Sequence, residues 1–386
     1  MTHDRRIFVS DPDRLRRGRR PRAARAAGAP GYEEAPGAHG PGPRIGGVLA
    51  RVTGPLHEER ISYAIIDDVA VDPTLESVEF ALGVYRQGGC DGVVSLGGGS
   101  PMDTGKAVRL LSSHPPPLAQ YDWARDGGRL ITHPMPPMVA IPTTAGTGSE
   151  ANRNLVVSLP ETGRKTIISS QSMVPSLALC DPELTYGMPP WLTAGTGMDA
   201  MVHSMEALWA NRFHPLADGM ARKGIELCGK FLVRAVKDGQ DREARAGMMI
   251  AALAGAAAMQ KALGPVHSLA HPLTPVCGLH HGVATAVVLP AVMEFNLDAA
   301  APQLAEIGVA LGEPPCGSVD EAAKRAVERV RAMRQEMPIP SRLRDAGVKE
   351  CQFPLLTEKA FQDTCHLANP RPCAPADLDL MFRASW

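Results

Sequence analysis

The stretch Gly92-Val-Val-Ser-Leu-Gly97-Gly-Gly-Ser-Pro-Met-Asp-Thr-Gly-Lys106 predicts the fold of the first half of this 386-residue chain. Its opening residues read as a buried strand, which runs directly into three consecutive glycines. Glycines between a strand and a helix let backbone N–H groups approach a phosphate, and the helix N-terminus adds a favourable dipole. The spacing fits neither the G-x-G-x-x-G fingerprint nor a Walker loop. The stretch therefore predicts a phosphate-binding turn, with a tight connection as the alternative.

Strands and a helix alternate around this turn, and their spacing predicts elements at residues 5–10, 61–67, 74–87 and 138–141. The last strand runs into Pro142-Thr-Thr-Ala-Gly-Thr-Gly-Ser-Glu150, and open α/β sheets bind ligands at such strand ends. Two such turns in one sheet predict a parallel α/β domain with a dinucleotide site. The hydroxyls offered by the second turn are those of Thr143, Thr144 and Thr147.

The second half of the chain differs in composition and in the spacing of its apolar residues. It contains long segments that are rich in Ala and Met and have a helical period, at residues 192–210, 216–237, 242–262 and 284–297. We therefore expect an α/β dinucleotide-binding domain over residues 1–185 and a helical domain over residues 186–386.

The helical half also holds one aspartate and three histidines that suit a metal ion. Asp199 and His203 are four residues apart in a helical segment, so both project from one face. His267 and His281 come from two later segments. One carboxylate and three imidazoles form a ligand set for a borderline divalent ion such as Fe²⁺ or Zn²⁺. The alternative interpretation is four unrelated polar residues in a core.

Two further histidines lie beside this set. His271 stands one helical turn after His267, and it can carry a proton or orient a substrate. Its alternative role is that of an ordinary core or surface histidine. We interpret His280 as a bystander, because His281, next to Gly282, fits the spacing better.

Composition limits the partners that we expect. The net charge is −1, with 44% hydrophobic and 21% charged residues, which gives no reason to expect nucleic acid or an anionic membrane as partner. No apolar run could cross a bilayer, and the start of the chain does not resemble a signal peptide. Eight cysteines without a C-x-x-C pair indicate free thiols in a reducing compartment, so we expect the cytoplasm.

Residues 12–57 are rich in Arg, Ala, Gly and Pro. They show no helical or strand period, which predicts a disordered or aberrant segment. The alternative is a basic arm for nucleic acid, but Tyr32 is its only aromatic residue for stacking. Seven arginines lie between Arg14 and Arg25, so we expect trypsin to cut there first.

The motifs taken together resemble those of the iron-dependent (group III) alcohol dehydrogenases. The matching segments occupy residues 97–106, 142–150, 197–203, 267–273 and 280–284. They recur in the family's order and at its separations, from about residue 61 to the end of the chain. Within the family, Gln240-Asp-Arg-Glu-Ala-Arg245 and Cys365-His-Leu-Ala-Asn-Pro370 are most similar to 4-hydroxybutyrate dehydrogenases.

The resemblance implies a Rossmann-like (dehydroquinate-synthase-like) N-terminal domain and an all-α C-terminal domain. It implies that Fe²⁺, or Zn²⁺, is held by Asp199, His203, His267 and His281, with His271 close to the nicotinamide and substrate. It places NAD(H) on the pyrophosphate-binding residues Gly98, Gly99 and Ser100, beside Thr143, Thr144 and Thr147, along Asn154 and Lys165, and near Leu179. Family members are commonly dimers or larger, so we expect a homodimer or a larger homo-oligomer.

The N-terminal part departs from the family pattern. Val9-Ser10-Asp11-Pro12 resembles the end of the family's first strand, where an acidic residue favours NAD by repelling a 2′-phosphate. Asp11 is therefore the expected residue for the adenosine half. The inserted residues 12–57 leave open a catalytically impaired family member that binds a metal but not NAD.

The expected function is a metal-dependent, NAD(H)-linked alcohol dehydrogenase or aldehyde reductase for a small primary alcohol or aldehyde. The favoured pair is 4-hydroxybutyrate and succinic semialdehyde. Such a carboxylate substrate needs a cation, for which Arg153 is the candidate unless it is a structural or exposed arginine. A second alternative is a metal- and NAD-dependent lyase resembling dehydroquinate synthases, although few basic residues lie near the motifs between Met198 and Val288.

Overall fold

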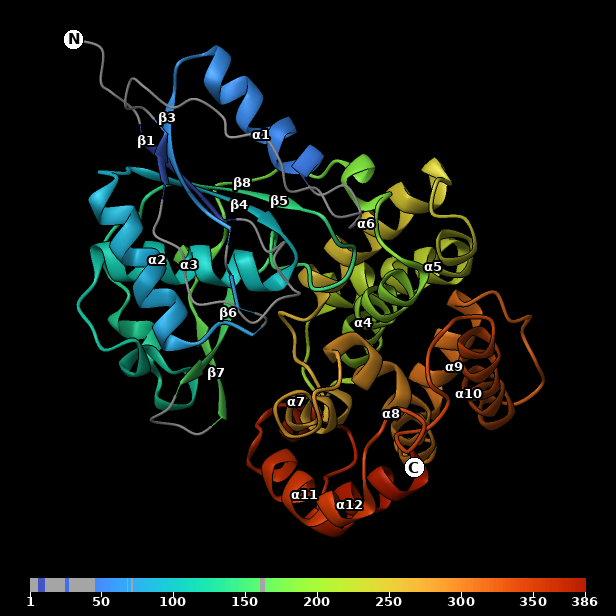
Figure 1. Cartoon of the computed structure of the whole chain (residues 1–386). Helices are drawn as coiled ribbons and strands as arrows, with labels where there is room; N and C mark the ends of the chain where they lie inside the picture. Colours follow the sequence, from blue (N-terminus) through green and yellow to red (C-terminus); the bar gives the residue numbers. More distant parts are fainter. Residues whose placement is uncertain (1–5, 11–24, 28–45, 68, 71, 160–163) are drawn as a thin grey trace. The chain divides into compact units, whose positions relative to one another are not determined.

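The computed structural model describes residues 6–10, 25–27, 46–67, 69–70, 72–159 and 164–386. The chain divides into two compact units. The first, called the α/β unit below, comprises Met1–Thr143 and Ser149–Gly187. The second, called the helical unit, comprises Thr144–Gly148 and Met188–Trp386. Figure 1 labels the elements of both.

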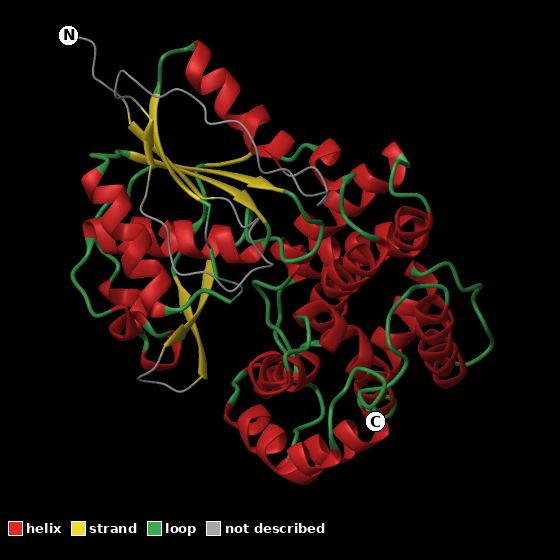
Figure 2. Cartoon of the chain, in the orientation of Figure 1, coloured by secondary structure: helices red, strands yellow, loops and turns green. Residues whose placement is uncertain are grey.

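A six-stranded sheet forms the centre of the α/β unit (Figure 2). Its strand order is β2-β3-β1-β4-β5-β8, and all neighbours are parallel except β2 and β3. The strands are β1 (Arg6–Ser10), β2 (Arg25–Ala27), β3 (Ser62–Ile66), β4 (Gly92–Gly97), β5 (Met138–Pro142) and β8 (Leu177–Ala178). The strands expected near residues 5–10, 61–67, 92–96 and 138–141 are therefore confirmed, as is a parallel α/β architecture.

Helices cover both faces of this sheet (Figure 1). Helices α2 (Leu75–Gln87) and α3 (Gly99–Ser113) share one core with Val93 of β4. On the other face, Val94 of β4 belongs to a second core, against which α1 (Gly46–Glu58) packs. Because successive side chains of a strand point to opposite faces, a strand that is buried along its whole length, such as β4, must be covered on both sides.

A separate two-stranded hairpin belongs to the same unit. Strands β6 (Asn154–Leu159) and β7 (Arg164–Ser169) pair antiparallel, with Asn154 opposite Ser169. Residues on one face of β6 are buried in the core that α2 and α3 share with the sheet: Leu155, Val157 and Leu159.

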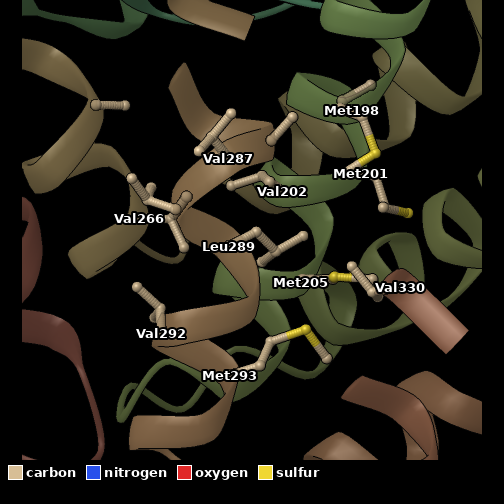
Figure 3. Packing of buried hydrophobic residues seen from close by; sticks show 14 of the residues in the cluster. Met198, Met201, Val202, Met205, Val266, Val287, Leu289, Val292, Met293 and Val330 are labelled. Atoms are coloured by element: carbon tan, nitrogen blue, oxygen red, sulfur yellow. The ribbon is translucent and has the colours of Figure 1, made fainter. Parts of the chain in front are cut away.

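The helical unit consists of nine α-helices over its described residues. They are α4 (Pro190–Trp209), α5 (Pro215–Lys237), α6 (Arg242–Ala258), α7 (Pro265–Cys277), α8 (His281–Phe295), α9 (Ala301–Ala310), α10 (Val319–Gln335), α11 (Phe353–Gln362) and α12 (Pro375–Ala384). Figure 3 shows methionines of α4 packing against valines and a leucine of α8 in the central core. Helix α8 is apolar on every side, as expected for a helix that is buried all round.

Part of the expectation for residues 12–57 is wrong. Residues 46–57 belong to helix α1, and residues 25–27 form strand β2. The apolar residues of α1 recur at helical spacing and pack against the sheet: Val48, Leu49, Val52 and Leu56. The glycines and Pro55 around them hide this period in the sequence. Asp11 and the rest of the stretch lie outside the described residues.

No helix among the described residues is long and apolar enough to cross a membrane.

Candidate functional site

Three helices of the helical unit bring the aspartate and histidines together. Asp199 and His203 lie on α4, one turn apart, so their side chains leave the same face. His267 stands in the first turn of α7, and His281 is the first residue of α8. The four residues proposed from the sequence therefore meet at one place, although they span more than eighty positions.

The carboxylate of Asp199 is the centre of this cluster. Its Oδ1 lies 3.8 Å from Nε2 of His203, 3.7 Å from Nε2 of His267 and 3.4 Å from Nε2 of His281. The rings of His203 and His267 are stacked, with centroids 4.9 Å apart. Three imidazole nitrogens thus face one carboxylate oxygen, which is the donor set that a borderline divalent cation prefers.

Burial makes this arrangement costly without a cation. The side chains of Asp199, His203 and His267 are almost fully buried, whereas that of His281 is 25% exposed. Among the residues that the structure describes, neither Oδ1 of Asp199 nor Nε2 of His267 has a hydrogen-bond partner. Unpartnered buried polar atoms are rare and need a reason. A metal ion satisfies both atoms at once, so these residues fit a metal site.

Glu206 orients one of the histidines. Its Oε2 lies 2.5 Å from Nδ1 of His267, and its two oxygens also accept the backbone N–H groups of Gly264 and Val266 at 2.9 and 2.7 Å. The carboxylate therefore accepts a hydrogen bond from Nδ1–H, which leaves the lone pair of His267 on Nε2. Glu206 was not among the residues expected from the sequence, although a charged residue three positions after His203 in an apolar helix is a signal.

The imidazoles experience opposing electrostatic effects. Burial lowers the pKa of His203, and the attraction of Asp199 offsets this only in part. Burial also lowers the pKa of His267, but the carboxylates of Glu206 and Asp199 outweigh it and raise this pKa overall. A metal binds the neutral form of an imidazole, which the lowered pKa of His203 favours and the raised pKa of His267 opposes.

Glycines allow the helices to approach closely enough for this geometry. A Cβ on Gly282 of α8 would lie 2.3 Å from the backbone oxygen of Gly195 on α4. Gly195 stands one turn before Asp199, and Gly282 follows His281 directly. A Cβ on Gly255 of α6 would lie 2.9 Å from the oxygen of Ala200. Close backbone contact therefore fixes α8 and α6 beside the turn of α4 that carries the candidate ligands Asp199 and His203.

His271 borders the cluster without joining the four. Its ring stacks on that of His281, with centroids 5.5 Å apart, and meets the ring of His267 edge-on at 5.7 Å. Nδ1 of His271 hydrogen-bonds Oδ2 of Asp363 at 2.8 Å. His280 instead packs edge-on against Trp191, with ring centroids 5.6 Å apart.

The nucleotide-binding residues proposed from the sequence lie in the α/β unit or in the segment that leaves it. Strand β4 ends at Gly97, and α3 begins at Gly99 with Gly98 as its N-cap, so no capping side chain covers the first N–H groups of the helix. The N–H of Thr143, after β5, donates to the oxygen of Gly97 at 3.0 Å. The glycine turn and Thr143 are therefore neighbours at the carboxyl ends of two parallel strands, where such sheets bind ligands.

Thr144 and Thr147 belong to a different environment. The segment Thr144–Gly148 clusters with the helical unit. A Cβ on Gly146 would lie 2.7 Å from the Cβ and backbone oxygen of Thr196 on α4, and one on Gly148 would lie 2.3 Å from Cβ of Ala256 on α6. The predicted cofactor loop is thus packed tightly against the helices that carry and flank the candidate metal ligands.

Ser100 and Lys165 meet through Asp72. Oγ of Ser100 accepts the N–H of Asp72 at 3.3 Å, and Nζ of Lys165 donates to Oδ1 of Asp72 at 2.8 Å. Asp72 has a left-handed backbone with φ of 55°. The ammonium of Lys165 is therefore already paired with a carboxylate, which the sequence did not indicate.

A buried lysine supports the start of β6. Nζ of Lys106 donates to Oγ of Ser149, to both the backbone and side-chain oxygens of Asn152, and to the oxygen of Asn154. Burial lowers the pKa of Lys106 to about 8, against the opposing attraction of Asp103. Lys106, at the end of the glycine motif, therefore holds the entry to the hairpin rather than a phosphate. Leu179, the remaining residue proposed for the cofactor, is about half exposed and follows β8.

Comparison with known proteins places these features in one family. The family model described as iron-containing alcohol dehydrogenase matches residues 39–182, and the model described as Fe-containing alcohol dehydrogenase family, C-terminal, matches residues 193–386. A 4-hydroxybutyrate dehydrogenase of Cupriavidus necator is 40% identical over 334 residues, which cover 84% of this chain and 85% of the relative.

Solved structures agree with this result. The crystal structure of a 1,3-propanediol oxidoreductase has a TM-score of 0.88 and 34% identity, covering 99% of this chain and 92% of that one. A sulfoacetaldehyde reductase from Bifidobacterium kashiwanohense, solved in complex with NAD⁺, has a TM-score of 0.77 and 25% identity over 98% of this chain and 90% of that one. With the glycine turn inside one matched family model and the histidine cluster inside the other, this chain belongs to the iron-containing alcohol dehydrogenase family and is an oxidoreductase.

Proposed function

We propose that the enzyme is an NAD(H)-linked, metal-dependent alcohol dehydrogenase or aldehyde reductase. Fe²⁺, with Zn²⁺ as the alternative, would be held by Asp199, His203, His267 and His281. The observation that carries this proposal is the buried, unpartnered Oδ1 of Asp199 with three imidazole nitrogens within 3.8 Å. NAD(H) would lie along Gly98, Gly99 and Ser100, beside Thr143, Thr144 and Thr147, with Asn154, Lys165, Leu179 and Asp11 along its length.

When bound, the cation would act as a Lewis acid on the substrate oxygen, and the nicotinamide would supply or accept the hydride. The protein supplies the arrangement. Glu206 keeps the lone pair of His267 on Nε2, and burial of Asp199 excludes water from its charge. His281 is the most exposed member of the cluster and marks the side open to a substrate. His271, beside His281, is the proposed catalytic residue that orients the alcohol and carries its proton.

The proposed substrate is a small primary alcohol or aldehyde, with 4-hydroxybutyrate and succinic semialdehyde as the favoured pair. The 40% identical 4-hydroxybutyrate dehydrogenase supports this choice. A carboxylate at the far end of the substrate needs a cation. Arg153, which is partly exposed and directly precedes β6, is the candidate for this role.

Reconstitution tests the reaction. Metal-free protein is loaded with Fe²⁺ or with Zn²⁺, and NADH oxidation is measured with succinic semialdehyde, butyraldehyde and 3-hydroxypropanal. We expect turnover only in the loaded enzyme and the highest kcat/KM with succinic semialdehyde. Metal uptake without NADH binding, measured by fluorescence, would instead identify a catalytically impaired family member.

Substitution tests the carboxylate clamp. Arg153→Gln should lower kcat/KM for succinic semialdehyde by 10-fold or more, because one charge-assisted hydrogen bond is lost. The same variant should change kcat/KM for butyraldehyde, which has no carboxylate, by less than a factor of about 3. An unchanged ratio between the two aldehydes rules out Arg153 as the clamp.

We also propose a homodimer or larger homo-oligomer in the cytoplasm. All eight cysteines are free thiols, which suits a reducing compartment. Size-exclusion chromatography with light scattering measures the assembly, and a mass of one chain would contradict it.

A further inference from the structure

The side chain of Asp363 accepts three hydrogen bonds, two of which come from helix α7. It lies between α11 and the short helix Cys365–Ala368. Its Oδ2 accepts Nδ1–H of His271 at 2.8 Å, and its Oδ1 accepts Oγ–H of Ser268 and the N–H of Cys365, both at 2.8 Å. Within the described part of the chain, the only ion pair of Asp363 is the one with His271.

Ser268 of α7 fixes the position of the Asp363 carboxylate. While its Oγ donates to Asp363, the same Oγ accepts the N–H of His366 at 2.9 Å. Ser268 and His271 lie three positions apart on α7 and therefore share a face. The turn at 363–366 is thus locked to the helix face that presents His271, and the side chain of Asp363 is only 16% exposed.

The carboxylate is ionised and acts as an acceptor. Burial on its own would raise the pKa of Asp363, but the neighbouring His271 and the hydrogen bonds hold this pKa well below its usual range. An ionised carboxylate cannot donate a proton, so the hydrogen between Asp363 and His271 sits on Nδ1 of the imidazole. Neutral His271 then carries its lone pair on Nε2.

The free edge of His271 borders the cluster of proposed metal ligands. Its ring stacks on His281 and touches the edge of His267. Among the described residues, the side-chain hydrogen bond of His271 is the one that Nδ1 makes with Asp363, and Nε2 makes none. This nitrogen is therefore left for a group that enters the site.

A second metal site is the competing explanation, because His271, Asp363 and Cys365 also lie close enough to hold an ion. The hydrogen bonds argue against it, since both oxygens of Asp363 are already occupied by donors. The thiol is also unsuited to be a ligand, because burial and the carboxylate of Asp363 raise the pKa of Cys365 well above its usual value.

We propose that Asp363 is a positioning residue that fixes His271 in the tautomer with hydrogen on Nδ1, so that Nε2 accepts the hydrogen bond of the substrate hydroxyl. This inference rests on the proposed alcohol dehydrogenase function. It names a residue 92 positions from His271 that acts on the reaction only through that histidine.

Asp363→Asn in the full-length, metal-loaded enzyme tests the inference. The amide oxygen can still accept from Ser268 and Cys365, but its NH₂ group would face Nδ1 as a donor and force the hydrogen onto Nε2. We expect kcat to fall by about 100-fold or more, as with other histidines held in the wrong tautomer or removed from proton transfer. KM for NADH, metal content and thermal midpoint should stay near the wild-type values. Asp377→Asn, a cap of α12, is the matched control and should leave kcat unchanged.

A double-mutant comparison separates positioning from a structural role. In a His271→Ala background, adding Asp363→Asn should change kcat by less than about 3-fold, because the group on which Asp363 acts is absent. If Asp363→Asn lowered kcat in that background as much as it does in the wild type, the proposal would be overturned, since Asp363 would then act by a route other than His271.

The tautomer itself can be measured without activity. Zinc-loaded protein with ¹⁵N-labelled histidine is compared with His271→Ala, which identifies the His271 signals by their disappearance. We expect a protonated Nδ1 in the wild type and a protonated Nε2 in Asp363→Asn. A protonated Nε2 in the wild type overturns the proposal. Failure of the proposed function would appear separately, as absent NADH turnover in a protein that has the expected tautomer.

Discussion

At the level of single residues, the environment of the Asp199 carboxylate is the reason that we propose a cation at this site. A buried carboxylate normally collects hydrogen-bond donors, yet its Oδ1 faces three ring nitrogens and has no donor among the described residues. Glu206 is the contrast, because its two oxygens accept three donors. The two carboxylates stand seven residues apart on α4. Their different partners are the reason that we propose Asp199 as a metal ligand and Glu206 as the residue that supports His267.

Removal of one ligand should release the metal. His267→Ala takes away one of four donors and leaves Glu206 without its imidazole, so we expect metal affinity to fall by more than about 100-fold. Turnover should be lost with it. Plasma emission spectroscopy after dialysis measures the metal content. His271→Ala is the control, which should keep the metal and lose rate. Normal metal in His267→Ala, or lost metal in His271→Ala, would mean that the ligands are misassigned.

Glu150 should make the α/β unit sensitive to pH. Burial raises the pKa of this carboxyl from 4.5 to about 7, and it is 3% exposed. Between these values the folded state holds a proton that the unfolded state has released, so stability falls as pH rises from about 4.5 to 7. A pKa shift of this size lowers the free energy of unfolding at pH 8 by about 3 kcal/mol. Glu150→Gln should recover this stability at pH 8, but it should have no such effect at pH 4.5.

Urea unfolding at the two pH values measures this difference. Glu183→Gln, which changes a half-exposed carboxylate of the same unit, is the control and should show no such pH dependence. An equal effect of Glu150→Gln at both pH values would show that Glu150 is not a neutral buried acid at low pH.

Helix packing determines at the level of elements whether the ligands can meet. Gly282 and Gly195 bring α8 against α4 with backbone-to-backbone contact. Side chains of both helices belong to one buried core, in which Figure 3 labels Met201 of α4 and Val287 of α8. The meeting of His281 with Asp199 and His203 therefore depends on one close crossing between α8 and α4.

A single methyl group should open that crossing. In Gly282→Ala the Cβ would lie 2.3 Å from the oxygen of Gly195, so α8 must move away. We expect a loss of about 2–3 kcal/mol in stability together with weaker metal binding, because His281 moves with α8. Chemical denaturation and metal titration measure the two effects. Gly219→Ala on α5 meets nothing within 4 Å and should stabilise by up to about 1 kcal/mol. Equal stability of the two variants would contradict a tight crossing.

The sequence predicted elements well where apolar spacing was regular and long. The predicted strand at 92–96 corresponds to β4, and the segment 216–237 corresponds to α5. Helix α1 was missed because Gly46, Gly47 and Pro55 interrupt a period that only its contact with the sheet reveals. Ligand types and local spacing made the four candidate metal ligands recognisable. Asp363 was not, because its partner is 92 positions away and no local pattern links them.

At the level of the whole molecule, the segment Thr144–Gly148 connects the chemistry of the two units. It continues directly from β5, whose following residue Thr143 bonds to the glycine turn. Yet its own contacts are with α4 and α6, at Thr196 and Ala256. Five residues therefore run from the proposed nucleotide site onto the helix that carries Asp199 and His203.

This connection predicts that both ligands stabilise the same short segment. A ligand that binds only the folded state protects the elements it contacts, by RT ln(1 + [L]/Kd), from local opening. Hydrogen exchange measured by mass spectrometry should therefore show protection of Thr144–Gly148 on loading with Zn²⁺ alone and further protection on adding NADH. Helix α10 (Val319–Gln335), which carries none of the proposed site residues, is the internal control and should respond to neither. The segment packs against α4, so we expect the protection given by NADH to depend on the metal. If NADH protects Thr144–Gly148 equally with and without the metal, the two sites are independent of each other.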